Sequence, residues 1–104
     1  MIDVWEDFNP VKECLLYAAE IVDNGWCQGA ANVNGRYCAL GAICQAAINV
    51  RKQYGLINEY YIGPDAMDTF RDHLGQFEIV VWNDTPGRTK EEVSKALKEC
   101  AEGI

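Results

Sequence analysis

The sequence predicts a mainly α protein, a single compact domain of about four helices with a short β-hairpin before the central helix. Three observations lead to this prediction. Apolar residues recur at helical spacing in four stretches, an Asn34-Gly35 pair separates two short segments typical of strands, and glycine or proline marks most boundaries. Because 104 residues give room for one hydrophobic core, we expect residues 1–104 to form one domain.

The first predicted helix begins after Asn9. The Asn9 side chain can cap the helix, Pro10 suits the first helical position, and apolar residues recur at helical spacing from Val11 to Val22. An Asn24-Gly25 pair suits the left-handed conformation that ends many helices. We therefore expect a helix between these two signals.

The hairpin and the central helix follow directly along the chain. Asn34-Gly35, between Ala31–Val33 and Arg36–Cys38, predicts a hairpin with a type I′ turn. The stretch from about Cys38 to Tyr54 has few polar positions before Gly55, which predicts the most buried helix. Gly41 within it would permit close approach of a neighbouring backbone.

A third helix is predicted to begin at Gly63-Pro64-Asp65, with the proline at its first position, and to end at Gly75. The four apolar residues Ile79–Trp82 fit either a buried strand or a short helix, because so short a run does not reveal its period.

A turn and a capping pattern predict where the last helix begins. Pro86-Gly87 favours a type II turn. Thr89 and Glu92 then form a capping-box pattern, and Val93, Ala96, Leu97 and Cys100 give the helix an apolar inner face.

The charge balance argues against two classes of partner. Sixteen acidic and nine basic residues give a net charge of -7, which disfavours duplex nucleic acid and anionic membranes. A small cluster of arginines could still hold a compact anion, because a pocket depends mostly on its own charges and dipoles.

The sequence contains no segment that predicts export or membrane insertion. Residues 1–8 lack the basic start and apolar centre of a signal peptide, and Cys38–Val50 is shorter than the roughly 20 residues of a transmembrane helix. Five cysteines, an odd number, favour a reducing cytoplasmic location without disulfides. With no C-x-x-C pattern and one histidine, we expect neither a metal site nor a cofactor.

Two polar-aromatic segments are candidate ligand-binding sites. Trp26–Gly29 combines an indole, a thiol, a carboxamide and a glycine, and could line a pocket; alternatively, Trp26 packs over the core and Gln28 bonds loop backbone. Trp82, Asn83 and Asp84 precede Arg88 and Thr89 at a helix start, where anions bind readily. There Arg88 could hold a phosphate or carboxylate while Trp82 stacks on a base.

The structural alternative for this second segment is an ion pair of Asp84 with Arg88 or with Arg36, with Asn83 bonding the turn backbone.

A thiol site is the second hypothesis. Cys38 at the start of the central helix would face the positive end of the helix dipole, which activates thiols, although a buried packing role also fits. Cys38 or Cys27, His73 and then Asn83 or Asp84 give the order nucleophile, base and orienting group of papain-like thiol enzymes. Alternatively, His73 is an exposed residue near a helix end.

Three spaced blocks, Trp26–Gly29, Gly35–Ala42 and Trp82–Val93, resemble a family of short bacterial and phage proteins, a domain of unknown function. The resemblance covers most of the chain and implies no activity. In that family threonine often replaces Cys27 and no histidine is fixed at His73, which argues against a catalytic pair. The phage members suggest an accessory or anti-defence role. The residues on the family's characteristic positions are Trp26, Gln28, Gly29, Arg36, Cys38, Gly41, Asn83, Asp84, Gly87, Arg88 and Thr89.

These observations favour a small non-enzymatic binding module. The two segments Trp26–Gln28 and Trp82–Arg88 are expected to converge on the start of the central helix. There, Arg36, Arg88 and the indoles would sequester a small anionic or nucleotide-like ligand. The alternatives are a cysteine-dependent hydrolase or transferase, and an acidic inhibitor that docks on a basic protein. A patch with Tyr54, Tyr60 and Tyr61 could support a homo-oligomer.

Overall fold

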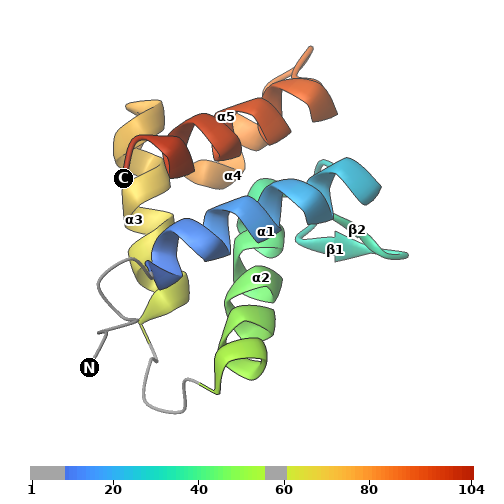
Figure 1. The fold of residues 1–104 in the computed structure, drawn as a ribbon. Helices are drawn as coiled ribbons and strands as arrows, with labels where there is room; N and C mark the ends of the chain where they lie inside the picture. The colour runs from blue at the N-terminus through green and yellow to red at the C-terminus, as the bar shows by residue number, and fades with distance from the viewer. Residues whose placement is uncertain (1–8, 56–60) are drawn as a thin grey trace, which may run out of the picture.

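A computed structural model describes residues 9–55 and 61–104, and within these ranges it contains five helices and one two-stranded hairpin. Figure 1 shows their arrangement. The elements are α1 (Pro10–Asn24), β1 (Asn32–Val33), β2 (Arg36–Tyr37), α2 (Ala39–Tyr54), α3 (Ile62–Leu74), α4 (Ile79–Asn83) and α5 (Lys90–Glu102). The mainly α class and the hairpin before the second helix are therefore confirmed. Of the Tyr54, Tyr60 and Tyr61 patch, Tyr60 lies outside the described residues.

Helix α1 is the centre of the packing. It contacts α5, α2 and α3, and in Figure 1 it crosses the molecule with α3 at one end and the hairpin at the other. The largest fully buried side chains come from these four helices, with Leu15 on α1, Ile43 on α2, Phe70 on α3 and Leu97 on α5. They form one apolar core, as the length predicted.

The start of α1 agrees with the prediction, and its end does not. Asn9 Oδ1 accepts hydrogen bonds from the backbone N–H groups of Val11 (3.0 Å) and Lys12 (3.2 Å). Gly25, expected to be left-handed, has φ 172°, which is extended backbone. Glycine instead avoids a tight contact there, because a Cβ atom would lie 3.2 Å from the carbonyl oxygen of Gly35.

The hairpin has the predicted turn and is attached to the segment after α1. Asn34 (φ 52°) and Gly35 (φ 78°) both have the positive φ that a type I′ turn requires. The Tyr37 N–H donates to Gly25 O (3.0 Å), and its carbonyl accepts from Cys27 N–H (3.2 Å). Strand β2 therefore holds the backbone of residues 25–27 beside the hairpin.

The hairpin also packs closely on α2. Cys38 caps this helix, and Gly55 ends it in the left-handed conformation (φ 65°), as predicted. A Cβ atom on Gly41 would clash with the carbonyl oxygen of Ala31 and lie 2.9 Å from its carbonyl carbon. The close backbone approach predicted at Gly41 is confirmed.

Helix α3 begins earlier than the sequence suggested. Its first residue is Ile62, and the N–H of Asp65 donates to Tyr61 O (2.8 Å), so Pro64 occupies the third helical position rather than the first. Proline is tolerated there because the first-turn N–H groups have no partner within the helix. Gly75 ends the helix with φ 65°.

The ambiguous segment Ile79–Trp82 belongs to the short helix α4, where Trp82 N–H donates to Glu78 O (3.2 Å). In the following turn Gly87 has φ 87°, and Arg88 N–H donates to Thr85 O (3.0 Å), as a type II turn requires. The capping box of α5 is formed, since Thr89 Oγ1 accepts from Glu92 N–H (3.2 Å) and Glu92 Oε1 from Thr89 N–H (3.2 Å).

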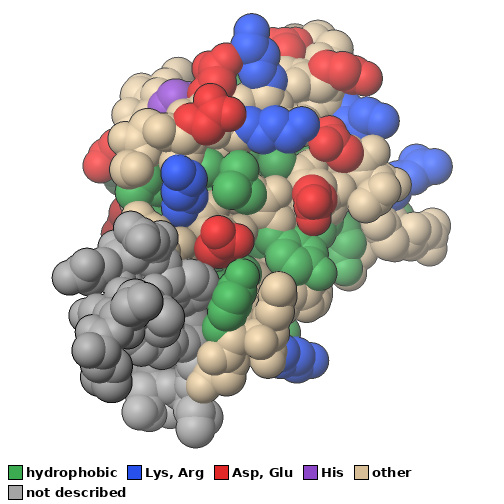
Figure 2. Space-filling view, in the orientation of Figure 1, with side chains coloured by type: hydrophobic (Ala, Val, Ile, Leu, Met, Phe, Trp, Pro, Cys, Tyr) green, Lys and Arg blue, Asp and Glu red, His purple; other side chains and the backbone are tan. Residues whose placement is uncertain are grey.

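The surface formed by α1 and α5 carries interspersed acidic and basic side chains (Figure 2). At the end of α1, the Asp23 carboxylate bonds Lys98 Nζ (3.4 Å). The hydroxyl of Ser94 and this lysine lower the pKa of Asp23. Among the described residues, no helix is both long enough and apolar enough to span a bilayer.

Replacement of Gly41 tests the contact between the hairpin and α2. We expect Gly41→Ala to lower the free energy of unfolding by about 2 kcal/mol or more, because the new methyl group forces backbone apart. Gly63→Ala is the matched control, since its Cβ would meet Ala47 Cβ at an ordinary 3.4 Å. Urea unfolding of both variants measures the effect, and equal stability would contradict the close approach.

Candidate functional site

Asn83, the last residue of α4, is a polar side chain with 0% exposure. Its Oδ1 accepts hydrogen bonds from Trp26 Nε1 (2.7 Å) and the N–H of Ala39 (3.0 Å). Its Nδ2 donates to Cys27 O (3.1 Å) and to Asp84 Oδ1 (3.0 Å). A carboxamide offers two acceptor sites and two donors, so all four are used.

The two polar-aromatic segments meet around this residue. Gln28 Nε2 donates to the carbonyl oxygens of Asn83 (3.0 Å) and Thr85 (3.2 Å), and Gly29 N–H donates to Asp84 Oδ1 (3.1 Å). We call the side chains of Trp26, Gln28, Asn83 and Asp84 the Asn83 cluster. The bonds from Trp26 and Gln28 to Asn83 join residues more than 50 positions apart in the chain.

The Asn83 cluster lies at the start of α2, where the two segments were expected from the sequence to converge. The first N–H groups of a helix have no partner within the helix. Here Ala39 N–H donates to Asn83 Oδ1, and Gly41 N–H donates to Cys38 Sγ (3.3 Å). Asn83 thus supplies part of the cap of a helix that is distant in sequence.

Arg88 and Trp82 form a second, adjoining group. The guanidinium lies 4.3 Å from the centre of the indole ring, and Nε donates to Trp82 O (3.0 Å). Nη1 donates to Glu92 Oε2 (3.0 Å), and the Phe70 ring meets the Trp82 ring edge-to-face at a centroid distance of 5.7 Å. Arg88 is therefore held by its own chain through a carbonyl, a carboxylate and a π face.

This arrangement differs from the ion pairs considered for Asp84. Arg88 pairs with Glu92 rather than Asp84, and the Asp84 carboxylate accepts from Gly29 N–H and Asn83 Nδ2. Arg36 is exposed on β2. Hydrogen bonding to Arg88 lowers the pKa of Glu92, so this pair stabilises the fold above the ordinary carboxyl range and loses its effect as pH falls.

The residues proposed from sequence for a ligand site are thus divided between two bonded groups and three separate positions. Six of them form two bonded groups in which their polar atoms contact one another: Trp26, Gln28, Trp82, Asn83, Asp84 and Arg88. Thr89 caps α5, Cys38 caps α2, and the Arg36 side chain is exposed at the hairpin.

The residues of the alternative thiol site are placed differently. Cys27 Sγ lies within hydrogen-bond distance of two carbonyl oxygens, of Ala30 (3.3 Å) and Arg36 (3.4 Å), either of which can accept its one S–H. His73 is exposed in the last turn of α3. Because α3 and the hairpin lie on opposite sides of the molecule (Figure 1), the structure does not bring this histidine to Cys27 or Cys38.

The cysteines, all within the described ranges, are free thiols. Burial raises the pKa of Cys14 to about 12, and burial also raises the pKa values of Cys27, Cys44 and Cys100. Across residues 9–55 and 61–104, no group of three His, Cys, Asp or Glu side chains is placed to hold a metal ion.

The sequence did not predict an exposed apolar surface that lies beside the Asn83 cluster. Phe77 is 89% exposed, and on the outer side of α4 Val81 is 64% and Val80 37% exposed. We call Phe77, Val80 and Val81 the α4 face. The sequence did contain a signal for this surface: Phe77 is an aromatic residue within the polar segment Gly75–Glu78 between two helices.

The family comparison covers both the Asn83 cluster and the α4 face. A model of a family of unknown function, DUF6197, matches residues 8–103. The chain belongs to this family. No curated protein and no solved structure matches the chain. The resemblance to a domain of unknown function, noted from the sequence blocks, is confirmed at this level.

Removal of the Asn83 side chain tests its role in holding the two segments together. Asn83→Ala leaves Trp26 Nε1, Ala39 N–H and Cys27 O without their partner, and each buried unsatisfied group costs about 1–3 kcal/mol. We expect thermal and urea unfolding to show a loss of about 3 kcal/mol or more. Asn49→Ala, which removes only an acceptor for Gln45, is the control and should cost less than about 0.5 kcal/mol. Similar losses in both variants would contradict this role.

The raised pKa values predict slow thiol chemistry at neutral pH. Because the thiolate is the reactive form, brief iodoacetamide treatment of the native protein at pH 7 should label only slowly the four cysteines whose pKa values are raised. Intact-mass measurement follows the labelling, and denatured protein provides the fully reactive control. Labelling should accelerate as pH rises toward the thiol pKa values. Rapid modification of Cys27 or Cys38 alone at pH 7 would instead support the thiol-enzyme alternative.

Proposed function

We propose that this protein is a non-enzymatic module that acts by binding another protein chain through the α4 face. The observation that carries the proposal is the 89% exposure of Phe77. An exposed phenylalanine next to further exposed apolar side chains is typical of surfaces that are covered by a partner.

The fold itself makes little use of Phe77. The residue before a helix cap often packs on the fourth helical residue, which here is Trp82. That indole is already in contact with Phe70 and Arg88. Phe77 is therefore left at the surface by the packing of its own neighbours.

Burial of this side chain by a partner would contribute to binding. Complete burial of a phenylalanine side chain is worth roughly 1.5–3 kcal/mol, and Val81 would add to it. Aromatic residues in the middle of a small apolar patch are also the residues that most often dominate interface energies. The α4 face has this composition.

The Asn83 cluster supports the same proposal, because its polar atoms are bonded within the chain. Its donors and acceptors bond one another, and Arg88 is engaged by Glu92 and the carbonyl of Trp82. This gives the cluster the role of a support for α4. A small anionic or nucleotide-like ligand would have to displace these bonds, and such a ligand remains a prediction from sequence. A phage accessory or anti-defence role remains a prediction as well, and a protein-binding module could perform it.

A photo-crosslinker placed at position 77 tests the proposal in cells. We expect irradiation to give a discrete protein adduct when benzoylphenylalanine replaces Phe77, because this side chain is the most exposed of the α4 face. The same crosslinker at Val33, which is 44% exposed on the hairpin, should not give this adduct. Val81→Asp should abolish the adduct formed from position 77. Adducts identified by mass spectrometry reveal whether the partner is a foreign protein or a second copy.

Two outcomes would overturn the proposal: absence of any protein adduct at position 77, or equal adducts at positions 77 and 33. The readout does not depend on core packing, because the replaced side chain is exposed.

A further inference from the structure

We propose that Asn34, at the tip of the β1–β2 hairpin, is a site of spontaneous covalent modification, at which the side-chain amide is hydrolysed through a ring formed with Gly35. Asn24 and Asn34 are the two asparagines of this chain that directly precede a glycine. Both asparagines are exposed. Their backbone surroundings differ, and this difference makes one of them reactive and protects the other.

The reaction requires only these two residues and water. The Gly35 nitrogen attacks the side-chain carbonyl carbon of Asn34, and the side-chain amino group leaves as ammonia together with the proton of the Gly35 N–H. The resulting cyclic imide is opened by water at either of its carbonyl groups, which gives aspartate or isoaspartate. A glycine in the second position favours the attack, because it has no Cβ atom to obstruct the approach.

At Asn34 the attacking nitrogen is not engaged by the fold. Asn34 (φ 52°) and Gly35 (φ 78°) are the central residues of the type I′ turn, and the hydrogen bond of such a turn belongs to the next N–H, that of Arg36. Within residues 9–55 and 61–104, no backbone carbonyl accepts from the Gly35 N–H. A Cβ atom on Gly35 would meet nothing within 4 Å, so this side of the turn is open.

At Asn24 the attacking nitrogen is held. The Gly25 N–H donates to the carbonyl oxygens of Ile21 (3.2 Å) and Val22 (3.1 Å), which close the last turn of α1. A Cβ atom on Gly25 would also lie 3.2 Å from the Gly35 carbonyl oxygen, so the hairpin crowds this glycine. Ring closure at Asn24 therefore requires the end of α1 to open.

The hairpin tip can reach the reactive geometry at low cost. The attack requires rotation about the bond between Cα and the carbonyl carbon of Asn34, which takes the turn apart locally. Strands β1 and β2 contain two residues each, and a two-stranded hairpin is marginally stable by itself. Local opening of such an exposed tip needs much less free energy than global unfolding.

The two products affect the fold differently. Aspartate tolerates a positive φ, and Asp-Gly also suits a type I′ turn. Isoaspartate adds a methylene group to the main chain, so that a two-residue turn no longer matches the register between β1 and β2. The effect extends beyond the tip, because Tyr37 of β2 bonds the backbone of Gly25 and Cys27.

Peptide mapping by mass spectrometry of the full-length protein, incubated in mildly alkaline buffer at body temperature, tests the proposal. We expect the peptide that contains residue 34 to gain the mass of an amide-to-acid conversion, as a mixture of aspartate and isoaspartate. In the native protein this gain should be at least about tenfold faster at Asn34 than at Asn24, because the α1 end opens less often. In guanidinium-denatured protein the two sites should react at similar rates, since both precede glycine.

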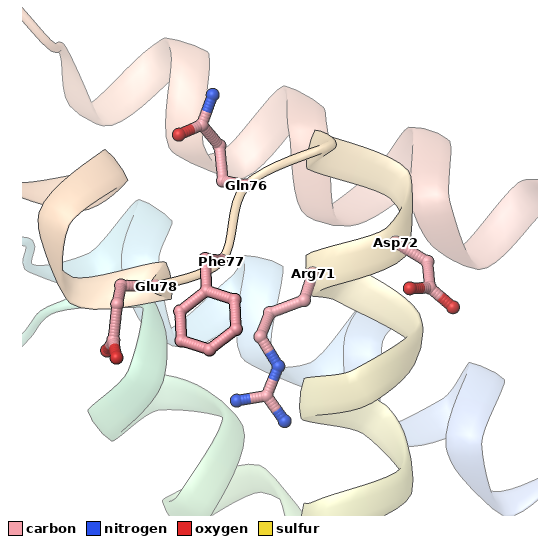
Figure 3. A pocket seen from close by; sticks show the side chains of 5 residues that line it. All are labelled: Arg71, Asp72, Gln76, Phe77 and Glu78. Carbon is pink, nitrogen blue, oxygen red and sulfur yellow. The ribbon is translucent and has the colours of Figure 1, made fainter.

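Gln76 controls for exposure of an amide alone. It lies on the surface between α3 and α4, and Figure 3 shows its side chain pointing away from the other labelled side chains. Its longer side chain would have to close a larger ring, and the next residue is Phe77 rather than glycine. We expect no gain in mass at this position.

Variants at position 34 separate the reaction from its structural effect. Asn34→Gly removes the reactive amide and keeps the turn, because Gly-Gly also suits type I′. It should abolish the gain in mass and retain the circular dichroism spectrum of the wild type. Asn34→Asp should unfold in urea like the wild type, whereas the isoaspartate form, isolated by chromatography, should unfold at a lower urea concentration.

Equal rates at Asn24 and Asn34 in the native protein would overturn the proposal. It would also be overturned if Asn34 stayed unmodified in the native protein under conditions in which the denatured chain reacts. An isoaspartate form as stable as Asn34→Asp would overturn the effect assigned to the lengthened turn.

Discussion

The hydrogen bonds of the buried Asn83 amide fix how the last part of the chain sits on the first. This one side chain bonds groups on the loop after α1, on the first residue of α2 and on its own neighbour Asp84. Buried polar groups are costly unless they are bonded, and an amide with four bonded sites is satisfied in few alternative packings. The Asn83 amide therefore selects one arrangement of these segments, while the apolar core supplies most of the stabilising area.

The orientation of α4 follows from this constraint. A helix of five residues is not stable by itself in water, so its position depends on what holds it. Asn83 and Trp82 hold its inner side through the Asn83 cluster and through Phe70 and Arg88. With these two residues facing inward, helical geometry places Val81 on the outer, exposed side of α4. The buried polar bonds and the exposed apolar surface are thus two sides of the same short helix.

Local signals in the sequence predicted much of the fold. The caps at Asn9 and Thr89, the turn at Asn34-Gly35 and the helix ends at Gly55 and Gly75 depend on neighbouring residues, and each is present. The partners of Asn83 could not be predicted, because they lie up to 57 residues away and depend on packing. The same holds for Gly25, whose extended backbone is set by the hairpin, and for Phe77, whose exposure results from Phe70 and Arg88 occupying Trp82.

In this family member, the residues that hold the fold together differ from the residues exposed on the α4 face. The blocks that stand out in the sequence, around Trp26, Cys38 and Asn83, contain polar residues whose bonds are made within the chain. Such residues can be constrained by folding alone, because each loss leaves buried partners unsatisfied. Surface residues such as Phe77 and Glu78 are under no such constraint from the fold. Residues that would contact the proposed partner are therefore best sought next to the prominent blocks, where the supported helix meets solvent.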